Sequence, residues 1–259
     1  MRGNRYDGKR VLITGSGGYF GREFTHAFAQ EGAALTLIDQ VSPTAAQLAS
    51  LGVNTHSIAL DLASSEDIVR TIAALPDDNL PDILINNAGI FPFVDILDVD
   101  AQLVKKIHDI NVVAPLLLTQ AIAKRWIALQ RPGVVINVSS AASEVARTNG
   151  ATYGPSKAAL EQMTRILAIR LGSHGIRVNA VRPGIADDPE HSHIPAEHLE
   201  SLSKSAPLGR TIAPGELARA VMFLSGPDAT FTTGHVLVVD GGGGLNRRAA
   251  LVAAEGVNK

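Results

Sequence analysis

The sequence predicts a protein of the α/β class, built on a doubly wound, seven-stranded parallel sheet with helices on both faces. Short apolar runs alternate with longer helical patterns along almost the whole chain, and these runs lack the polar alternation of half-exposed strands. Such an order requires right-handed crossovers between parallel strands. Because no linker, repeat or low-complexity tract interrupts it, we expect residues 1–259 to form a single domain.

The predicted strands are rich in β-branched residues and are bounded by Gly, Asp, Asn or Pro. They are Val11–Thr14, Ala34–Asp39, Ser57–Leu60, Ile83–Asn86, Val134–Val138, Val178–Val181 and Val236–Val239. The predicted helices are Phe20–Glu31, Pro43–Leu51, Ser65–Leu75, Ala101–Leu129, Thr152–Leu171 and Pro214–Leu224. Residues 184–209 depart from this alternation and are expected to form a lid over the substrate, and residues 245–259 are expected to form a C-terminal tail.

Composition narrows the possible functions. Hydrophobic residues make up 46% of the chain and the net charge is −2, so a large core is available and no basic footprint for nucleic acid or a membrane surface is present. The absence of cysteine excludes disulfides, thiol nucleophiles and cysteine-ligated zinc. No apolar run approaches the roughly 18 residues of a membrane span, and the polar N-terminus does not resemble a signal peptide. We therefore expect a soluble, cytoplasmic protein.

A glycine-rich turn lies between the first strand and the first helix, reading Thr14-Gly15-Ser16-Gly17-Gly18-Tyr19-Phe20-Gly21. Glycines permit a tight turn and let backbone N–H groups approach a pyrophosphate at the helix N-terminus. At the first strand–helix junction this pattern predicts a Rossmann-type dinucleotide site. Its expected contacts are Gly15, Gly18, Tyr19, Phe20 and Gly21. The alternative is an ordinary glycine-rich turn.

The second predicted strand ends in Asp39, which predicts the choice of cofactor. A carboxylate at this point can accept hydrogen bonds from the adenosine ribose hydroxyls, and it repels a 2′-phosphate. No Arg or Lys follows at positions 40 and 41. The sequence therefore predicts NAD(H) over NADP(H), the alternative being that Asp39 is a solvated turn residue.

Tyr153 and Lys157 lie four residues apart at the head of a predicted helix, where i and i+4 share a face. An ammonium near a phenol lowers a pKa that starts near ~10, and a hydroxyl from Ser139 or Ser140 could hold a substrate oxygen. This arrangement suits proton transfer to or from a carbonyl or alcohol oxygen. Pro155 requires Tyr153 to lie within a turn of the helix start. Because Tyr-x-x-x-Lys is common by chance, the pair gains its meaning from the other motifs.

With these motifs, the chain resembles the short-chain dehydrogenase/reductase family from Val11 to Gly242. Further motifs occur in the family's order: Asp61-Leu62, Asn86-Asn87-Ala88-Gly89, Asn111, Pro183-Gly184 and Val238-Val239-Asp240-Gly241-Gly242. Ser140 lies thirteen residues before Tyr153, the family's usual separation, which favours Ser140 over Ser139 as the catalytic serine. Each motif alone is weak, and their joint order is specific.

The resemblance implies a role for each of these residues. Tyr153 would be the acid/base, Lys157 would lower the pKa of Tyr153 and bind the nicotinamide ribose, Ser140 would steady the substrate oxygen, and Asn111 would hold a water. The implied cofactor contacts are Asp61, Leu62, Asn87, Ala88, Gly89, Tyr153, Lys157, Pro183, Gly184 and Ile185. Simpler interpretations remain open: Asp61, Asn87 and Ser140 could only stabilise turns, and Asn111 could be a satisfied helix amide.

Two departures from the family pattern stand out. Tyr19 occupies the position where the compact branch usually has its second glycine, so the glycine spacing looks more like the extended branch that acts on nucleotide sugars. The segment Ile185–Asp188 lacks the threonine that often contacts the nicotinamide amide. These departures leave the contacts to the pyrophosphate and to the nicotinamide amide open.

Three functions compete. The first is an NAD-dependent dehydrogenase or reductase acting on a small-molecule secondary alcohol or ketone, for which residues 90–93 could form an apolar pocket wall. The second is a nucleotide-sugar epimerase or dehydratase with tightly bound NAD, and the third is a non-catalytic NAD-sensing module. The resemblance implies a homo-oligomer, a tetramer or a dimer. His191, His193 and His198 have no accompanying carboxylates, so no metal site is predicted.

Overall fold

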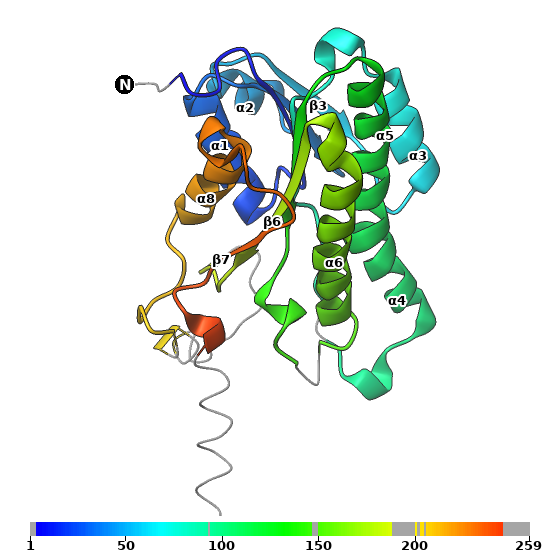
Figure 1. Cartoon of the computed structure of the whole chain (residues 1–259). Helices are drawn as coiled ribbons and strands as arrows, with labels where there is room; N and C mark the ends of the chain where they lie inside the picture. The colour runs from blue at the N-terminus through cyan, green and yellow to red at the C-terminus, as the bar shows by residue number, and fades with distance from the viewer. Residues whose placement is uncertain are drawn as a thin grey trace, which may run out of the picture.

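A computed structural model describes residues 4–92, 94–146, 150–187, 200, 203–204 and 206–245. Its centre is a parallel sheet with the strand order β3-β2-β1-β4-β5-β6-β7 (Figure 1). The strands are β1 Arg10–Thr14, β2 Ala34–Asp39, β3 Thr55–Ala59, β4 Ile83–Asn86, β5 Gly133–Val138, β6 Ile176–Pro183 and β7 Val236–Val239. The chain reverses its direction of travel across the sheet between β1 and β4, which is the place where doubly wound folds bind ligands. The predicted doubly wound α/β fold is confirmed.

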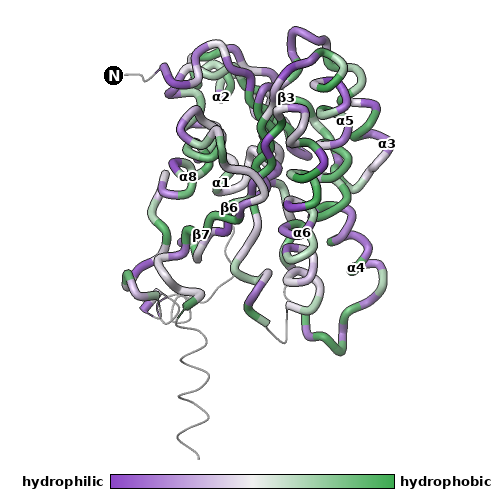
Figure 2. The backbone as a smooth tube through the Cα atoms, in the orientation of Figure 1, coloured by the Kyte–Doolittle hydropathy of each residue, from purple (hydrophilic) through white to green (hydrophobic). Residues whose placement is uncertain are grey.

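Helices cover both faces of the sheet. They are α1 Tyr19–Gln30, α2 Ala45–Ser50, α3 Ser65–Ala74, α4 Ala101–His108, α5 Ala114–Ala128, α6 Tyr153–Leu171 and α8 Glu216–Ser225. One core cluster joins α1 and α8 to the sheet through residues such as Phe24, Phe28 and Val221. The other joins α3, α5 and α6 through residues such as Ile68 and Trp126. Apolar residues gather along the strands and along α5 (Figure 2).

The helix expected over Ala101–Leu129 runs from Ala101 to Ala128, but it is not α-helical throughout. A π-helical turn, η3 Asp109–Val113, separates α4 from α5. Pro115 has no N–H to donate to the carbonyl of Asn111 four residues earlier, so a regular α-helical bond is lost at this point. The expectation of one long helix is confirmed, and the irregular turn within it carries Asn111. Within the described part of the chain, no helix is long and apolar enough to cross a membrane.

Trp126 on α5 is fully buried, and its Nε1 donates a hydrogen bond to the Pro81 carbonyl at 2.6 Å. The indole lies so close to the first residue of β5 that a Cβ on Gly133 would be 2.4 Å from the ring. Position 133 must therefore be glycine for α5 to pack on the sheet at this distance.

We expect Gly133→Ala to lower the free energy of unfolding by about 1–3 kcal/mol, because the added methyl overpacks the core. Gly172→Ala is the matched control, since no atom lies within 4 Å of its Cβ position and its φ of −58° suits alanine. The control should leave stability unchanged or raise it by about 0.4–1 kcal/mol. Urea unfolding followed by circular dichroism measures both, and equal stability of the two variants would contradict the packing described.

Candidate active site

The carboxyl ends of β1, β2, β4, β5 and β6 open into one cavity of about 1460 Å³. Almost every predicted site residue lines it: Gly15, Gly18, Tyr19, Phe20, Asp39, Asp61, Leu62, Asn87, Ala88, Gly89, Ser140, Tyr153, Lys157, Pro183, Gly184 and Ile185. Gly21 and Asn111 do not line the cavity, but they contact residues that do. The fold thus brings together residues that lie up to 170 positions apart, from Gly15 to Ile185.

The glycine turn is held tightly against the end of β4. Gly15 adopts a positive φ of +64°, and a Cβ there would lie 2.7 Å from Ala88 Cα. A Cβ on Gly21 would lie 2.0 Å from the Gly15 carbonyl oxygen, so the first and third glycines of the motif are both sterically required. Helix α1 begins at Tyr19, directly after the turn, so the N–H groups of its first turn lie beside the cavity. This geometry suits the pyrophosphate of a dinucleotide.

Asn87 fixes the turn from the neighbouring strand. Its Nδ2 donates to the carbonyls of Thr14 and Gly15 at 3.0 and 2.9 Å. The Thr14 hydroxyl in turn accepts hydrogen bonds from the backbone N–H groups of Asn87 and Ala88. The simpler interpretation of Asn87, as a residue that stabilises a turn, therefore describes its side chain in this structure.

The two carboxylates expected at the adenosine end line the same cavity. Asp39 accepts hydrogen bonds from the Gly17 and Gln40 N–H groups at 2.9 and 2.7 Å, and each carboxylate oxygen has a further lone pair. Asp61 accepts from the Ala63 N–H at 3.0 Å and so stabilises the turn before α3. Ser16 lines the same cavity, and its buried Oγ has no partner among the described residues. A ligand hydroxyl or phosphate oxygen could satisfy that atom, so this end of the cavity fits a nucleotide.

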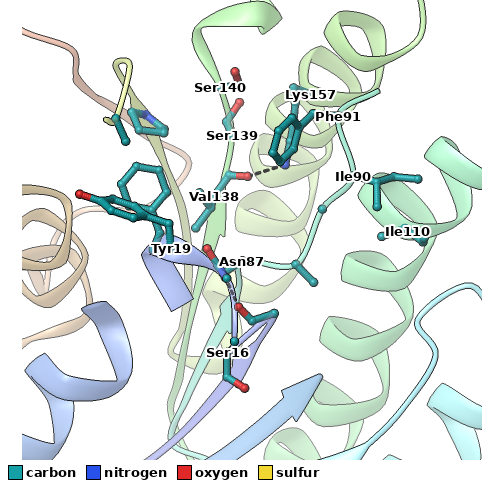
Figure 3. Close-up of a pocket in the computed structure, with 18 of the residues that line it drawn as sticks. Ser16, Tyr19, Asn87, Ile90, Phe91, Ile110, Val138, Ser139, Ser140 and Lys157 are labelled. Carbon is teal, nitrogen blue, oxygen red and sulfur yellow. Dashed lines mark hydrogen bonds between the residues drawn. The ribbon is translucent and has the colours of Figure 1, made fainter. Parts of the chain in front are cut away.

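Tyr153 is the first residue of α6, and Pro155 lies in the first turn as expected. One turn later, Lys157 is 3% exposed, and its Nζ donates to the Val138 carbonyl at 2.9 Å. Its Nζ lies 5.8 Å from the centre of the Tyr153 ring. Burial lowers the pKa of Lys157 to about 8, and the negative charge of Glu161 partly opposes that shift. Figure 3 shows Lys157 reaching the end of β5 near Ser139 and Ser140.

Asn111 is fully buried in the π-helical turn. Its Nδ2 donates to the Ile90 carbonyl and to Ser156 Oγ, and its Oδ1 accepts from the Ile90 N–H. A Cβ on Gly89 would lie 3.2 Å from both Asn111 Oδ1 and Lys157 Nζ. The side chain is thus a satisfied amide that holds the segment after β4 close to Lys157. The expected water beside Asn111 stays a prediction.

The two candidate serines have different environments. Ser139 is 3% exposed, and its Oγ donates to Glu161 at 2.6 Å. Ser140 is less buried, and its Oγ accepts only the nearby Ala142 N–H at 3.2 Å, which leaves the O–H to donate elsewhere. This difference agrees with the choice of Ser140 by its spacing from Tyr153.

Tyr19 leans away from Lys157 (Figure 3). Its ring packs edge-on against Phe20 with ring centroids 5.2 Å apart, and its hydroxyl hydrogen-bonds the Glu23 carboxyl. In Figure 3 the Tyr19 hydroxyl points away from Lys157. The substitution at the second glycine position is therefore accommodated by the first turn of α1.

The second departure from the family pattern, the missing threonine, lies in the segment that follows β6. The Gly184 N–H donates to the Val239 carbonyl, and a Cβ at Gly184 would lie 2.8 Å from Asp240 Cα. Ile185 follows and lines the cavity with an apolar side chain.

Most of the expected lid, including His191, His193 and His198, and the tail after Leu245 lie outside the described residues. In the ranges that are described, no three His, Cys, Asp or Glu side chains form a cluster suited to a metal ion.

Sequence reasoning missed Glu161 and Arg182, which lie behind Ser139 and bind each other in the protein interior. Glu161 is 4% and Arg182 6% exposed. The sequence offered two signals: Arg182 is a charged residue within an apolar strand, and Glu161 lies on the helix face that it shares with Lys157. Neither signal distinguishes a buried charge from a solvated one.

Comparison with known proteins identifies the family. A family model described as enoyl-(acyl carrier protein) reductase matches residues 19–243. A solved structure named as a short chain dehydrogenase/reductase family protein is 35% identical, with a TM-score of 0.79 over 93% of this chain and 99% of the other. The chain belongs to the short-chain dehydrogenase/reductase family. The resemblance found in the sequence is thereby confirmed.

The curated relatives match along nearly their whole length. Sorbitol dehydrogenase of Cereibacter sphaeroides is 33% identical over 92% of this chain and 98% of the relative. Galactitol 2-dehydrogenase of Agrobacterium fabrum is 31% identical with the same coverage. Among solved structures, 4-hydroxyisoleucine dehydrogenase complexed with NADH is 27% identical, with a TM-score of 0.85 over 90% of this chain and 98% of the other. Gluconate 5-dehydrogenase from Burkholderia cenocepacia, in complex with NADP and tartrate, is 29% identical, with a TM-score of 0.85 over 93% and 97%.

These comparisons show an oxidoreductase family whose structures hold nicotinamide cofactors of both kinds. The relatives named above are dehydrogenases, which does not favour the epimerase or the NAD-sensing alternative.

The buried Lys157 makes the stability of the protein depend on pH. Below about pH 8 the lysine is charged in both the folded and the unfolded chain. Between about 8 and 10.5 the folded chain releases this proton while the unfolded chain keeps it, so the free energy of unfolding rises with pH. We expect Lys157→Met to be more stable than the wild type at pH 7, by a margin that narrows as the pH rises to 10.

Urea unfolding at pH 7, 8, 9 and 10 measures this margin. The control is Lys105→Met, since the Lys105 side chain is 76% exposed on α4. The difference in free energy of unfolding between Lys105→Met and the wild type should change little between pH 7 and 10. A margin for Lys157→Met that is constant from pH 7 to 10 would contradict the lowered pKa.

Proposed function

We propose that this protein is an NAD-dependent oxidoreductase that transfers a hydride between the nicotinamide and the carbon of a secondary alcohol or ketone. The observation that carries this proposal is the position of Lys157, which is buried beside Tyr153 and near Ser140 in the cavity that begins at the glycine turn. Family membership supports the same reaction class.

The protein's residues would handle the proton while the cofactor supplies the redox chemistry at nicotinamide C4. In the oxidative direction, the Tyr153 phenolate accepts the proton of the substrate hydroxyl as the carbinol carbon loses its hydride. In the reductive direction, the Tyr153 phenol returns this proton to the carbonyl oxygen. The Lys157 ammonium favours the phenolate electrostatically, and Ser140 donates its hydroxyl hydrogen to the substrate oxygen.

Asn111 would complete this proton path by holding a water near Lys157. The π-helical turn supports this role, because Pro115 cannot donate to the Asn111 carbonyl and a regular helix would occupy that acceptor.

The choice of NAD over NADP rests on Asp39. The Gly17 N–H holds its carboxylate at the edge of the glycine turn, where it would accept bonds from ribose hydroxyls and repel a 2′-phosphate. Arg22 lines the same end of the cavity, with its guanidinium bonded to the Gly17 carbonyl. We infer that Asp39 outweighs this cation because it lies at the end of β2, where the ribose would bind.

A polyol or a related sugar ketone is the substrate class that we propose. Sorbitol dehydrogenase, galactitol 2-dehydrogenase and L-xylulose reductase are among the relatives. On the Ser140 side of the cavity, Glu144 offers a carboxylate for hydrogen bonds, and Phe91 offers an apolar wall whose ring centre lies 6.0 Å from that of Tyr153. Such mixed lining suits a carbon chain that bears several hydroxyls.

We also propose a cytoplasmic homo-oligomer, a tetramer or a dimer. Ile166 and Ile169 on the outer face of α6 are 56% and 83% exposed, and Phe231 near β7 is fully exposed. Exposed apolar side chains of this size are typical of surfaces that another copy covers.

The activity is tested with D-sorbitol, galactitol and xylitol together with NAD+, followed at 340 nm. We expect turnover of at least one polyol by the wild type and none by Tyr153→Phe, because the phenol that exchanges the proton is gone. Binding of NADH, followed by its fluorescence, should be nearly unchanged in that variant. Tyr6→Phe is the control, since Tyr6 is a buried core residue outside the cavity and its loss should not lower turnover. Retained activity in Tyr153→Phe would refute the role of Tyr153.

Asp39→Ala tests the choice of cofactor. We expect the wild type to prefer NAD+ in kcat/KM with a polyol, and we expect Asp39→Ala to lose much of this preference, because the repulsion of a 2′-phosphate is removed. Asp61→Ala is the control, because Asp61 lies at the same end of the cavity. It should change the preference for NAD+ over NADP+ less than Asp39→Ala does. Comparable kcat/KM for NAD+ and NADP+ in the wild type, or an unchanged preference in Asp39→Ala, would overturn the assignment.

A further inference from the structure

Glu161 on α6 has a buried carboxylate that accepts four hydrogen bonds. Its Oε1 accepts from Ser139 Oγ at 2.6 Å, from Ser143 Oγ at 2.7 Å and from Arg182 Nε at 2.9 Å. Its Oε2 accepts from Arg182 Nη2 at 2.7 Å. Burial acts to raise the pKa of Glu161, but the bonds from Arg182, Ser139 and Ser143 outweigh it and hold the pKa below its usual value. The carboxylate therefore stays charged and keeps all of its partners.

These partners come from separate segments of the active site. Ser139 directly follows β5, and Ser143 ends the short helix η4, Ala141–Ser143. Arg182 lies in β6 directly before Pro183 and Gly184. Its remaining nitrogen, Nη1, lies 2.7 Å from Glu144, whose side chain is 63% exposed at the cavity. One buried ion pair thus connects the helix of Tyr153 and Lys157 with the ends of two neighbouring strands.

Ser140 lies between the two anchored serines. Its Oγ accepts from the Ala142 N–H, and its carbonyl accepts from the Ser143 N–H at 3.0 Å. Lys157 and Glu161, one turn apart on α6, hold the consecutive residues Val138 and Ser139. With both ends of this turn fixed to α6, the distance between Ser140 and Tyr153 has little freedom.

Stability alone does not account for this arrangement. Buried ion pairs contribute little net stability, and apolar residues of similar volume often replace them without loss. A bidentate Arg–carboxylate pair does fix geometry, because its donors and acceptors must lie in one plane. The network is therefore better explained by the positions that it imposes than by its contribution to the free energy of folding.

We propose that Glu161 and Arg182 are positioning residues, which hold Ser139, Ser143 and Glu144 and thereby fix Ser140 and the turn of residues 141–145 against α6. This inference rests on the proposed function, in which Ser140 contacts the reacting oxygen. The network does not touch the substrate oxygen itself and acts through Ser140.

The test is a double-mutant cycle with D-sorbitol, galactitol or xylitol and NAD+. Glu161→Leu/Arg182→Met removes both charges of the ion pair together, so neither partner is left buried without the other. We expect kcat to fall by about tenfold to a hundredfold, since small misplacements of catalytic groups have effects of this size, while NADH affinity is retained. In a Ser140→Ala background the same double substitution should cause little further loss. An equal loss of kcat in both backgrounds, or no loss in either, overturns the proposal.

Asp82→Leu/Arg131→Met is the matched control. This ion pair, at 2.7 Å, joins a residue just before β4 to one just before β5, at the end of the sheet opposite the cavity. Its removal should leave kcat unchanged. Ser139→Ala/Ser143→Ala removes the anchors and keeps the ion pair, so it gives the same test if the first variant does not fold.

Hydrogen exchange gives a result that does not depend on any substrate. The amides of Ala142, Ser143, Glu144 and Val145 all donate within the turn. We expect them to lose protection in Glu161→Leu/Arg182→Met while the amides of α6 keep theirs, and unchanged exchange in the turn overturns the proposal. If the exchange changes as expected but the wild type oxidises no polyol, the positioning role stands and the proposed function fails.

Discussion

The burial of the Lys157 ammonium is the constraint on which the rest of the active site depends. A charged group removed from water needs acceptors at fixed positions, and the Val138 carbonyl provides one at 2.9 Å. The end of β5 must therefore lie against α6. The segment after β4 also approaches closely, and glycine at position 89 favours this approach, since a Cβ there would lie 3.2 Å from Lys157 Nζ. Asn111 holds that segment in place through its two bonds to the Ile90 backbone.

The cavity has a negative charge, Asp39, toward one end and a positive charge, Lys157, toward the other. Asp39 lies at the end of the cavity expected to bind adenosine, and Lys157 lies at the end expected to carry out catalysis. Glu161 opposes the lowering of the Lys157 pKa without entering the cavity, because its carboxylate is occupied by Arg182 and two serines. The helix N-terminus at Tyr19 provides uncharged donors between these ends. Under the proposed function, the site would combine a buried cation for proton chemistry with a glycine turn that binds a dinucleotide.

The sequence predicted the fold well because strands buried on both faces are uniformly apolar and β-branched, as in Val134–Val138. It did not show the π-helical turn inside Ala101–Leu129, since apolar periodicity does not register the single N–H that Pro115 lacks. Spacing alone selected Ser140, and the hydrogen bond of Ser139 to Glu161 agrees. Glu161 and Arg182 escaped prediction because charges in sequence show neither burial nor partners. Substrate identity could not be predicted, since it depends on how the side chains around Ser140 are arranged in space.

A direct titration of Lys157 tests the central claim. In protein labelled with ¹³C at the lysine ε-carbons, the account predicts one resonance that titrates at about pH 8 and disappears in Lys157→Met. A lysine in water titrates at about 10.4. If the Lys157 resonance itself titrates near 10.4, the ammonium is not desolvated, and the account of the active site is contradicted.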